Sequence, residues 1–223
     1  YKAARKLLDD IKIDVCHHVS IADFRCVGKL WKLNVPFIFG PVSGGQETPK
    51  CFSDYVKQHW KSEWFRKCMN EITTMLPSYR KALKKAALIG GGNDETLACM
   101  IRRMPKSHKQ KLVQMTELCI DKKYLDEREN IKKENGSVVH IIVSGRLIYR
   151  KGIQVLLEAV TKMNPLHNYK VDIYGDGDQR ALLEGFVKKS GLENRVIFHG
   201  NIPFDEMQNA YRNADIYVLP SLR

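Results

Sequence analysis

Residues 138–160 read VVHIIVSGRLIYRKGIQVLLEAV and predict a strand, a short basic loop and a helix in succession. The mostly apolar run 138–143 is typical of a strand that is buried on both faces of a parallel sheet, although a buried helix segment shows the same pattern. Beyond the loop, apolar residues return at the spacing of an amphipathic helix, namely at Ile153, Leu156, Leu157 and Val160. This order indicates the front half of a βαβ unit.

Two cations in the loop, Arg146 and Lys151, are the first candidates for binding a ligand. Open α/β sheets bind ligands at the carboxyl ends of their parallel strands, and cations placed there can face a phosphate. Charged side chains in a surface loop are also commonly no more than solvated charges. The loop alone therefore leaves both interpretations open.

The chain beyond residue 160 continues to alternate strands with helices. We predict strands at residues 169–174, 195–199 and 215–219, and helices at residues 179–189 and 206–212. This alternation implies right-handed crossovers and a parallel sheet.

The turn after residues 169–174 holds part of a dinucleotide-binding fingerprint. Gly175 and Gly177 match its first two glycines, but Arg180 stands where the third is expected. Two glycines at this spacing are weak evidence, so an NAD site is disfavoured.

The composition is that of an ordinary globular protein, with 223 residues, 43% of them hydrophobic and 28% charged. The almost wholly polar segment 121–136 is interpreted as a linker between two domains. The formal net charge of +12 favours anionic partners, such as phosphorylated ligands, an acidic membrane surface or nucleic acid.

Targeting and metal signals are not found. No apolar run approaches the roughly 18 to 20 residues that span a bilayer, and the chain shows no secretory signal. The six cysteines form no CxxC pair and have no zinc-finger spacing, so we expect reduced thiols and no metal site. We expect a cytoplasmic protein, and the inner face of the plasma membrane stays open as its place of action.

The first half of the chain contains two further strand patterns, at residues 13–18 and 35–39. The first ends in His17 and His18, whose side chains point to opposite sides of a strand, so at most one of them easily faces a cleft. A histidine held within the fold is an equally good interpretation. After the second strand, Gly44 and Gly45 either bring backbone N–H groups to a ligand or simply form a turn.

The segments between these strands are predicted to be helical. We expect one helix around residues 24–31 and a long basic, aromatic helical region at residues 53–85, which Pro77 breaks in two. Trp60 and Trp64 in that region suit either docking on an anionic membrane or packing on their own domain. A strand at residues 86–89 precedes a helix that Asn93 or Asp94 caps.

Several motifs together resemble a known family. The runs SGRLIYRKG, DIYGDGDQR, RVIFHGNIP and YRNADIYVLPS resemble the C-terminal domain of the group 1, or family 4, nucleotide-sugar glycosyltransferases of GT-B fold. The runs IDVCHHVS and VPFIFGPVSGG resemble the N-terminal domain of the same family. The resemblance covers nearly the whole chain and is weakest at residues 53–133.

The resemblance implies an α/β fold with two Rossmann-like parallel-sheet domains of GT-B type, both incomplete. Residues 1–120 would be the remainder of the N-terminal, acceptor-side domain, and residues 121–136 the linker. Residues 137–223 would be the first part of the C-terminal domain, which binds the nucleotide sugar.

The resemblance also implies site residues. Arg146 and Lys151 would hold the diphosphate of the donor without a metal, and the loop glycines Gly145, Gly175 and Gly177 would line the donor site. The nucleobase would lie near the backbone at Phe198, Gly200, Asn201 and Ile202. His17 or His18, with preference for His17, would be catalytic beside the donor sugar, and Gly44 and Gly45 would lie on the acceptor side, facing the cleft between the domains.

The implied function is retaining transfer of a hexose from a nucleotide sugar, preferably a UDP-sugar, to a glycan or lipid-linked acceptor in cell-surface glycan biosynthesis, with no further cofactor. The family carries two glutamates spaced by seven residues after the final PS, and the sequence ends before them at Arg223. We therefore expect an inactive fragment. The alternative is a non-catalytic membrane-docking or scaffold fragment that uses the basic aromatic segment. Nucleic acid is not expected as a partner, because the basic residues are spread along the chain.

Overall fold

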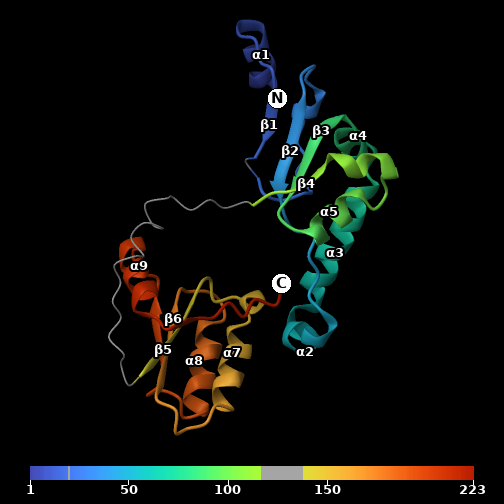
Figure 1. The fold of residues 1–223 in the computed structure, drawn as a ribbon. Helices are drawn as coiled ribbons and strands as arrows, with labels where there is room; N and C mark the ends of the chain where they lie inside the picture. Colours follow the sequence, from blue (N-terminus) through green and yellow to red (C-terminus); the bar gives the residue numbers. More distant parts are fainter. Residues whose placement is uncertain (20, 117–137) are drawn as a thin grey trace. The chain divides into compact units, whose positions relative to one another are not determined.

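The computed structural model describes residues 1–19, 21–116 and 138–223 (Figure 1). The chain forms two compact units. The first contains Tyr1–Glu47 and His59–Ile120, and the second contains Thr48–Gln58 and Asp121–Arg223. The expected first domain was continuous, whereas residues 48–58 make their contacts with the second unit. The expected linker at residues 121–136 lies outside the described residues.

The first unit is built on a four-stranded sheet in the order β1-β2-β3-β4, in which all neighbouring strands are parallel. The strands are β1 (Cys16–His18), β2 (Phe37–Val42), β3 (Ala86–Gly91) and β4 (Leu112–Gln114). Phe37 and Phe39 of β2 are almost fully buried and belong to the core cluster of the unit. The parallel pairing confirms the predicted α/β class. Strand β2 is apolar, as expected for a strand that is covered on both faces of a parallel sheet.

The described helices of the first unit are α1 (Lys2–Asp10), α3 (Trp60–Met75), α4 (Pro77–Lys85) and α5 (Asp94–Ile101). Pro77 occupies the first turn of α4, where its missing N–H costs little, so the predicted break in the helical region is confirmed. The short helix α2 (Ser53–Val56) precedes α3 in the chain and belongs to the second unit.

The helix predicted around residues 24–31 is wrong. Phe24 instead donates its N–H to the Ser43 carbonyl, and the Ser43 N–H donates to the Ala22 carbonyl. The segment therefore runs beside the end of β2. Gly28 then adopts a left-handed conformation with φ +61°, which interrupts any helix. Only a short 3₁₀ turn remains, at Leu30–Lys32.

Asn93 caps α5: its side-chain oxygen accepts the Thr96 N–H at 2.9 Å. Replacing Asn93 with alanine should lower the free energy of unfolding by about 1 kcal/mol, because one N-terminal N–H of the helix loses its partner. Urea denaturation measures this difference. Asn93→Ser retains a capping oxygen and should stay close to the unchanged chain; an equal loss in both variants would contradict a capping role.

The second unit contains a four-stranded parallel sheet in the order β7-β6-β5-β8. Its strands are β5 (Val139–Ser144), β6 (Tyr169–Tyr174), β7 (Val196–Gly200) and β8 (Ile216–Tyr217). Besides α2, its described α-helices are α7 (Ile153–Thr161), α8 (Arg180–Lys189) and α9 (Phe204–Asn213). The alternation predicted from the sequence is thus confirmed, and β5 lies inside the sheet between β6 and β8.

Helices α7 and α8 lie side by side on one face of this sheet, and α9 lies on the other (Figure 1). The buried core includes Val143 of β5, Leu157 of α7 and Leu183 of α8. Across the described ranges, no helix combines the length and the apolar character that crossing a bilayer would require.

Candidate functional site

The carboxyl ends of β5, β6 and β7 are joined by backbone hydrogen bonds at one edge of the second sheet. Gly145 donates its N–H to the Tyr174 carbonyl at 2.9 Å, and Gly175 donates to the Gly200 carbonyl at 2.7 Å. Three of the glycines expected in the donor site therefore come together, although they are far apart in the sequence.

The loops at this edge pack too closely for side chains. A Cβ on Gly175, where φ is +120°, would lie 2.0 Å from the Gly145 carbonyl oxygen. A Cβ on Gly177 would lie 2.4 Å from the Leu147 carbonyl oxygen. These glycines serve close backbone packing, which leaves the edge lined by backbone and by the few side chains that the loops carry.

The two predicted cations lie in the β5–α7 loop of this edge. Lys151 is half-buried and its side chain lies over Gly145, where a Cβ would be 3.8 Å from Lys151 Cε, while Arg146 is exposed. Within the part of the chain that the structure describes, neither side chain forms an ion pair or a hydrogen bond. Both charges are thus available to an anionic ligand.

Arg180, by contrast, is bound to its neighbours. Its guanidinium pairs with Asp176 at 3.0 Å and with Glu184 at 2.8 Å. The Gly177 N–H and the Arg180 guanidinium hold the pKa of the Asp176 carboxyl below its ordinary value. Since this arginine is held by two carboxylates, it leaves less positive charge for a phosphate than Arg146 and Lys151 do.

The segment expected near the nucleobase starts at the end of β7. Phe198 packs partly against the core of the unit, and Gly200 ends the strand. Asn201 is exposed and Ile202 is half-buried. The backbone here is joined to Gly175, so this segment lies at the same edge as the glycine loops.

The two histidines of the first unit lie in different environments. His17 is exposed, and its Nε2–H donates to the Gly40 carbonyl at 2.6 Å. His18 is buried, with its ring 5.5 Å from that of Phe39, and its Nδ1 has no hydrogen-bond partner among the described residues. Only His17 is therefore accessible from solvent.

Residues that the sequence did not indicate fix the loop at Gly44 and Gly45. The Gly44 carbonyl accepts hydrogen bonds from Asn70 at 3.2 Å and from Arg66 at 3.4 Å. The Gly45 N–H donates to Thr96 Oγ1 at 3.1 Å and is therefore not available to a ligand. The sequence signal that could have indicated these contacts is the spacing of Arg66 and Asn70. They are four residues apart, so they lie on the same face of helix α3.

Comparison with known proteins finds a family match in the second half of the chain. Residues 126–223 match the family described as Glycosyl transferases group 1. An uncharacterized glycosyltransferase of Methanocaldococcus jannaschii is 39% identical over 82 residues, which are 37% of this chain and 21% of that protein. The 2-deoxystreptamine glucosyltransferase of Streptomyces kanamyceticus is 30% identical over 99 residues, covering 44% of this chain and 25% of that protein.

Solved structures show the same fold. HepE of Anabaena, solved in complex with UDP, superposes with a TM-score of 0.60 at 14% identity, over 98% of this chain and 56% of that one. At this identity the likeness establishes the fold alone. The matched segments thus span about a quarter or less of the two curated relatives and about half of the HepE chain. The chain thus has an α/β fold of GT-B type, and its residues 126–223 match the group 1 glycosyltransferase family.

Proposed function

We propose that the second unit binds the diphosphate of a nucleotide sugar at the carboxyl edge of its sheet, through Arg146 and Lys151. The observation that carries this proposal is that two cations without a described acidic partner lie beside loops packed too closely for side chains. Such an edge suits a ligand with several negative oxygens, because both cations are free to pair with it.

The chemistry of sugar transfer requires such a site. When the bond from the sugar to the nucleoside diphosphate breaks, negative charge accumulates on the leaving diphosphate. Cations that are already in place in a partly dry site stabilise this charge better than water does. Arg146 can meet two phosphate oxygens at once, and Lys151 supplies a compact positive charge. No metal is needed in this scheme.

The remaining roles follow the family motifs. The backbone of residues 198–202 would take the nucleobase, and UDP is the preferred nucleotide, which the UDP bound in the HepE structure supports. His17 is the catalytic candidate beside the sugar, since it is the accessible one of the two histidines. We infer transfer with retention, at the cytoplasmic side, to a glycan or lipid-linked acceptor.

A thermal-shift panel of this chain with UDP, GDP and ADP tests the donor site. At about 100 times its dissociation constant, a nucleotide that binds only the folded state adds roughly 2.7 kcal/mol of stability. We expect UDP to raise the melting temperature of the second unit, and the double variant Arg146→Ala/Lys151→Ala to lose this shift. An equal shift in the variant would mean that the nucleotide binds elsewhere, and no shift with any nucleotide would contradict the proposal.

A further inference from the structure

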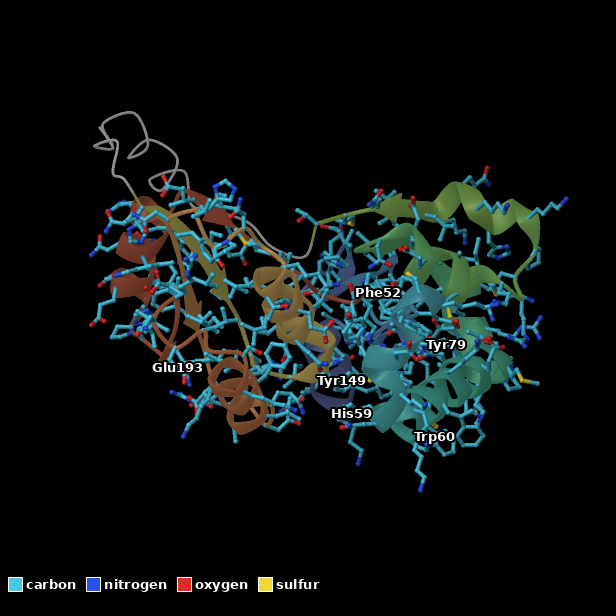
Figure 2. The ribbon with its side chains drawn as sticks, turned by 90° about the horizontal axis from the view of Figure 1, so that it is seen from below. Phe52, His59, Trp60, Tyr79, Tyr149 and Glu193 are labelled. Carbon is cyan, nitrogen blue, oxygen red and sulfur yellow. The ribbon has the colours of Figure 1, made fainter. Side chains whose placement is uncertain are left out.

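Residues 48–58, which we call the 48–58 arm, interrupt the first unit in the sequence but belong to the second unit. The arm begins three residues after Gly45 and contains helix α2. Helix α2 lies against η6 (Tyr149–Lys151), a 3₁₀ turn at the end of the β5–α7 loop. Figure 2 labels Phe52 of the arm and Tyr149 of the turn. The arm therefore contacts the turn whose last residue is Lys151.

The arm is anchored to helix α7 by a hydrogen bond between two half-buried side chains. The Tyr55 hydroxyl donates to Glu158 Oε2 at 2.5 Å, and the Gln154 amide donates to Glu158 Oε1 at 3.0 Å. A hydrogen bond to an ionised carboxylate is roughly twice as strong as one between neutral groups. The Glu158 carboxylate raises the pKa of the Tyr55 hydroxyl, chiefly through this bond, so the tyrosine keeps the proton that it donates.

The turn η6 is also held by residues near the end of the sequence. Leu222 donates its N–H to the Arg150 carbonyl at 2.9 Å. A Cβ on Gly152, where φ is +65°, would lie 2.1 Å from the Pro220 carbonyl oxygen, so the two backbones are in close contact. The turn that carries Lys151 is thus supported by residues 220–222 and, from a distant part of the sequence, by the 48–58 arm.

A turn of this kind depends on such support. Hydrogen bonds in a 3₁₀ turn have poorer geometry than those of an α-helix, so a single turn holds its shape weakly by itself. Lys151 also has a flexible side chain that ends in a compact charge, so the place of its ammonium depends on where the backbone holds it. A cation stabilises a phosphate well only if it is already in place, and small displacements are costly. Contacts that fix the turn therefore bear directly on a ligand of Lys151.

We propose that Tyr55 and Glu158 are positioning residues for the donor: their bond seats the 48–58 arm against η6, and the seated arm holds Lys151 in place at the carboxyl edge of the sheet. This inference rests on the proposed role of Lys151 in binding the diphosphate. Neither Tyr55 nor Glu158 contacts the ligand in this scheme, because both act through the turn. Since the arm continues the loop of Gly44 and Gly45, the segment that follows the expected acceptor-side loop then helps to shape the donor site.

Hydrogen exchange at the Lys151 and Gly152 amides, followed by NMR without nucleotide, tests whether the arm holds the turn. Both amides bond within the turn region, to the carbonyls of Ile148 and Tyr149. Tyr55→Phe removes the donating oxygen and little else, so both amides should exchange about 3- to 10-fold faster, as expected for the loss of one hydrogen bond. UDP affinity, measured by isothermal titration calorimetry, should fall by a similar factor. Unchanged exchange at both amides would overturn the proposal.

The matched control removes a hydroxyl elsewhere in the same unit. Tyr169, at the start of β6, donates to the Val160 carbonyl at 3.4 Å, and Tyr169→Phe should leave both the exchange at the turn and UDP affinity unchanged. Glu158→Gln keeps an oxygen that can accept from Tyr55, so it should lose less UDP affinity than Glu158→Ala.

Equal losses of UDP affinity in Tyr55→Phe and Tyr169→Phe would also overturn the proposal, because the loss would then reflect stability alone. If the unchanged chain did not bind UDP, the proposed donor site would fail, and the exchange measurement would still decide whether the arm holds the turn.

Discussion

The double variant Arg146→Ala/Lys151→Ala is expected to bind UDP at least about 100-fold more weakly than the unchanged chain. Each cation that is removed takes with it hydrogen bonds to a charged group, which contribute about 1.5–3 kcal/mol apiece. A hundredfold change corresponds to about 2.8 kcal/mol. Since neither side chain pairs with a described residue, the substitution breaks no internal bond that would offset this loss. Isothermal titration calorimetry with UDP measures the change.

A control with the same change of charge separates phosphate contact from the general field of a basic protein. Lys170 and Lys188 are exposed in the same unit, Lys170 near the amino end of β6 and Lys188 in the last turn of α8. Lys170→Ala/Lys188→Ala should therefore change UDP affinity only slightly, and less so as salt increases. If both double variants lost affinity equally, direct contact by Arg146 and Lys151 would be excluded.

Sugar transfer should respond to the same double variant more strongly than ground-state binding does. The diphosphate carries its full charge only as it leaves the sugar, so each cation contributes most in the transition state, by about 2 to 4 kcal/mol. In an assay of donor turnover by the native enzyme that contains these residues, we expect the rate to fall by the factor that this loss of transition-state free energy implies. Unchanged turnover would remove both residues from the mechanism.

Replacing Gly175 with alanine should destabilise the second unit by about 2–4 kcal/mol. Its φ of +120° is strained for any residue with a Cβ, and the new atom would lie 2.0 Å from the Gly145 carbonyl oxygen. Relief of this clash must move the Gly145 loop, so UDP affinity should fall with stability. Urea denaturation and titration with UDP measure the two effects.

Gly185 provides the matched comparison, because a Cβ there would meet nothing within 4 Å. It lies in the middle of α8, where alanine loses less backbone entropy than glycine on folding. Gly185→Ala should therefore stabilise the unit by about 0.5–1 kcal/mol and leave UDP binding unchanged. Destabilisation of similar size in both variants would show that the tight packing at Gly175 is not the cause.

The second unit was largely predictable from the sequence, because its signals are local. The apolar run before Gly145 and the helical spacing after it need no distant partner to be recognised, and the same holds for residues 169–174, where strand β6 has the predicted bounds. The helix predicted at residues 24–31 failed because its backbone pairs with Ser43, a contact that no local pattern encodes.

The candidate site was predictable only in part. Family motifs named the glycines and cations, and the structure adds that the backbone of Gly145 is bonded to Tyr174 and that of Gly175 to Gly200. The anchors of the Gly44 loop were not predicted, because Asn70 and Thr96 reach it from helices α3 and α5, far away in the sequence. The orientation of α3, with Asn70 buried and Trp60 exposed, needed coordinates as well, since sequence alone does not say which face of a helix turns inward.

The backbone bonds between the glycine loops have a consequence for how the site can change over time. Because Gly145 and Gly175 extend the hydrogen bonding of the sheet beyond β5 and β6, the floor of the proposed donor site shares the stiffness of the sheet. A preference for a different sugar or base can then evolve through exposed side chains such as Asn201, while the floor stays as it is. Slow hydrogen exchange at the Gly145 and Gly175 amides would show that this floor opens as rarely as the strands do.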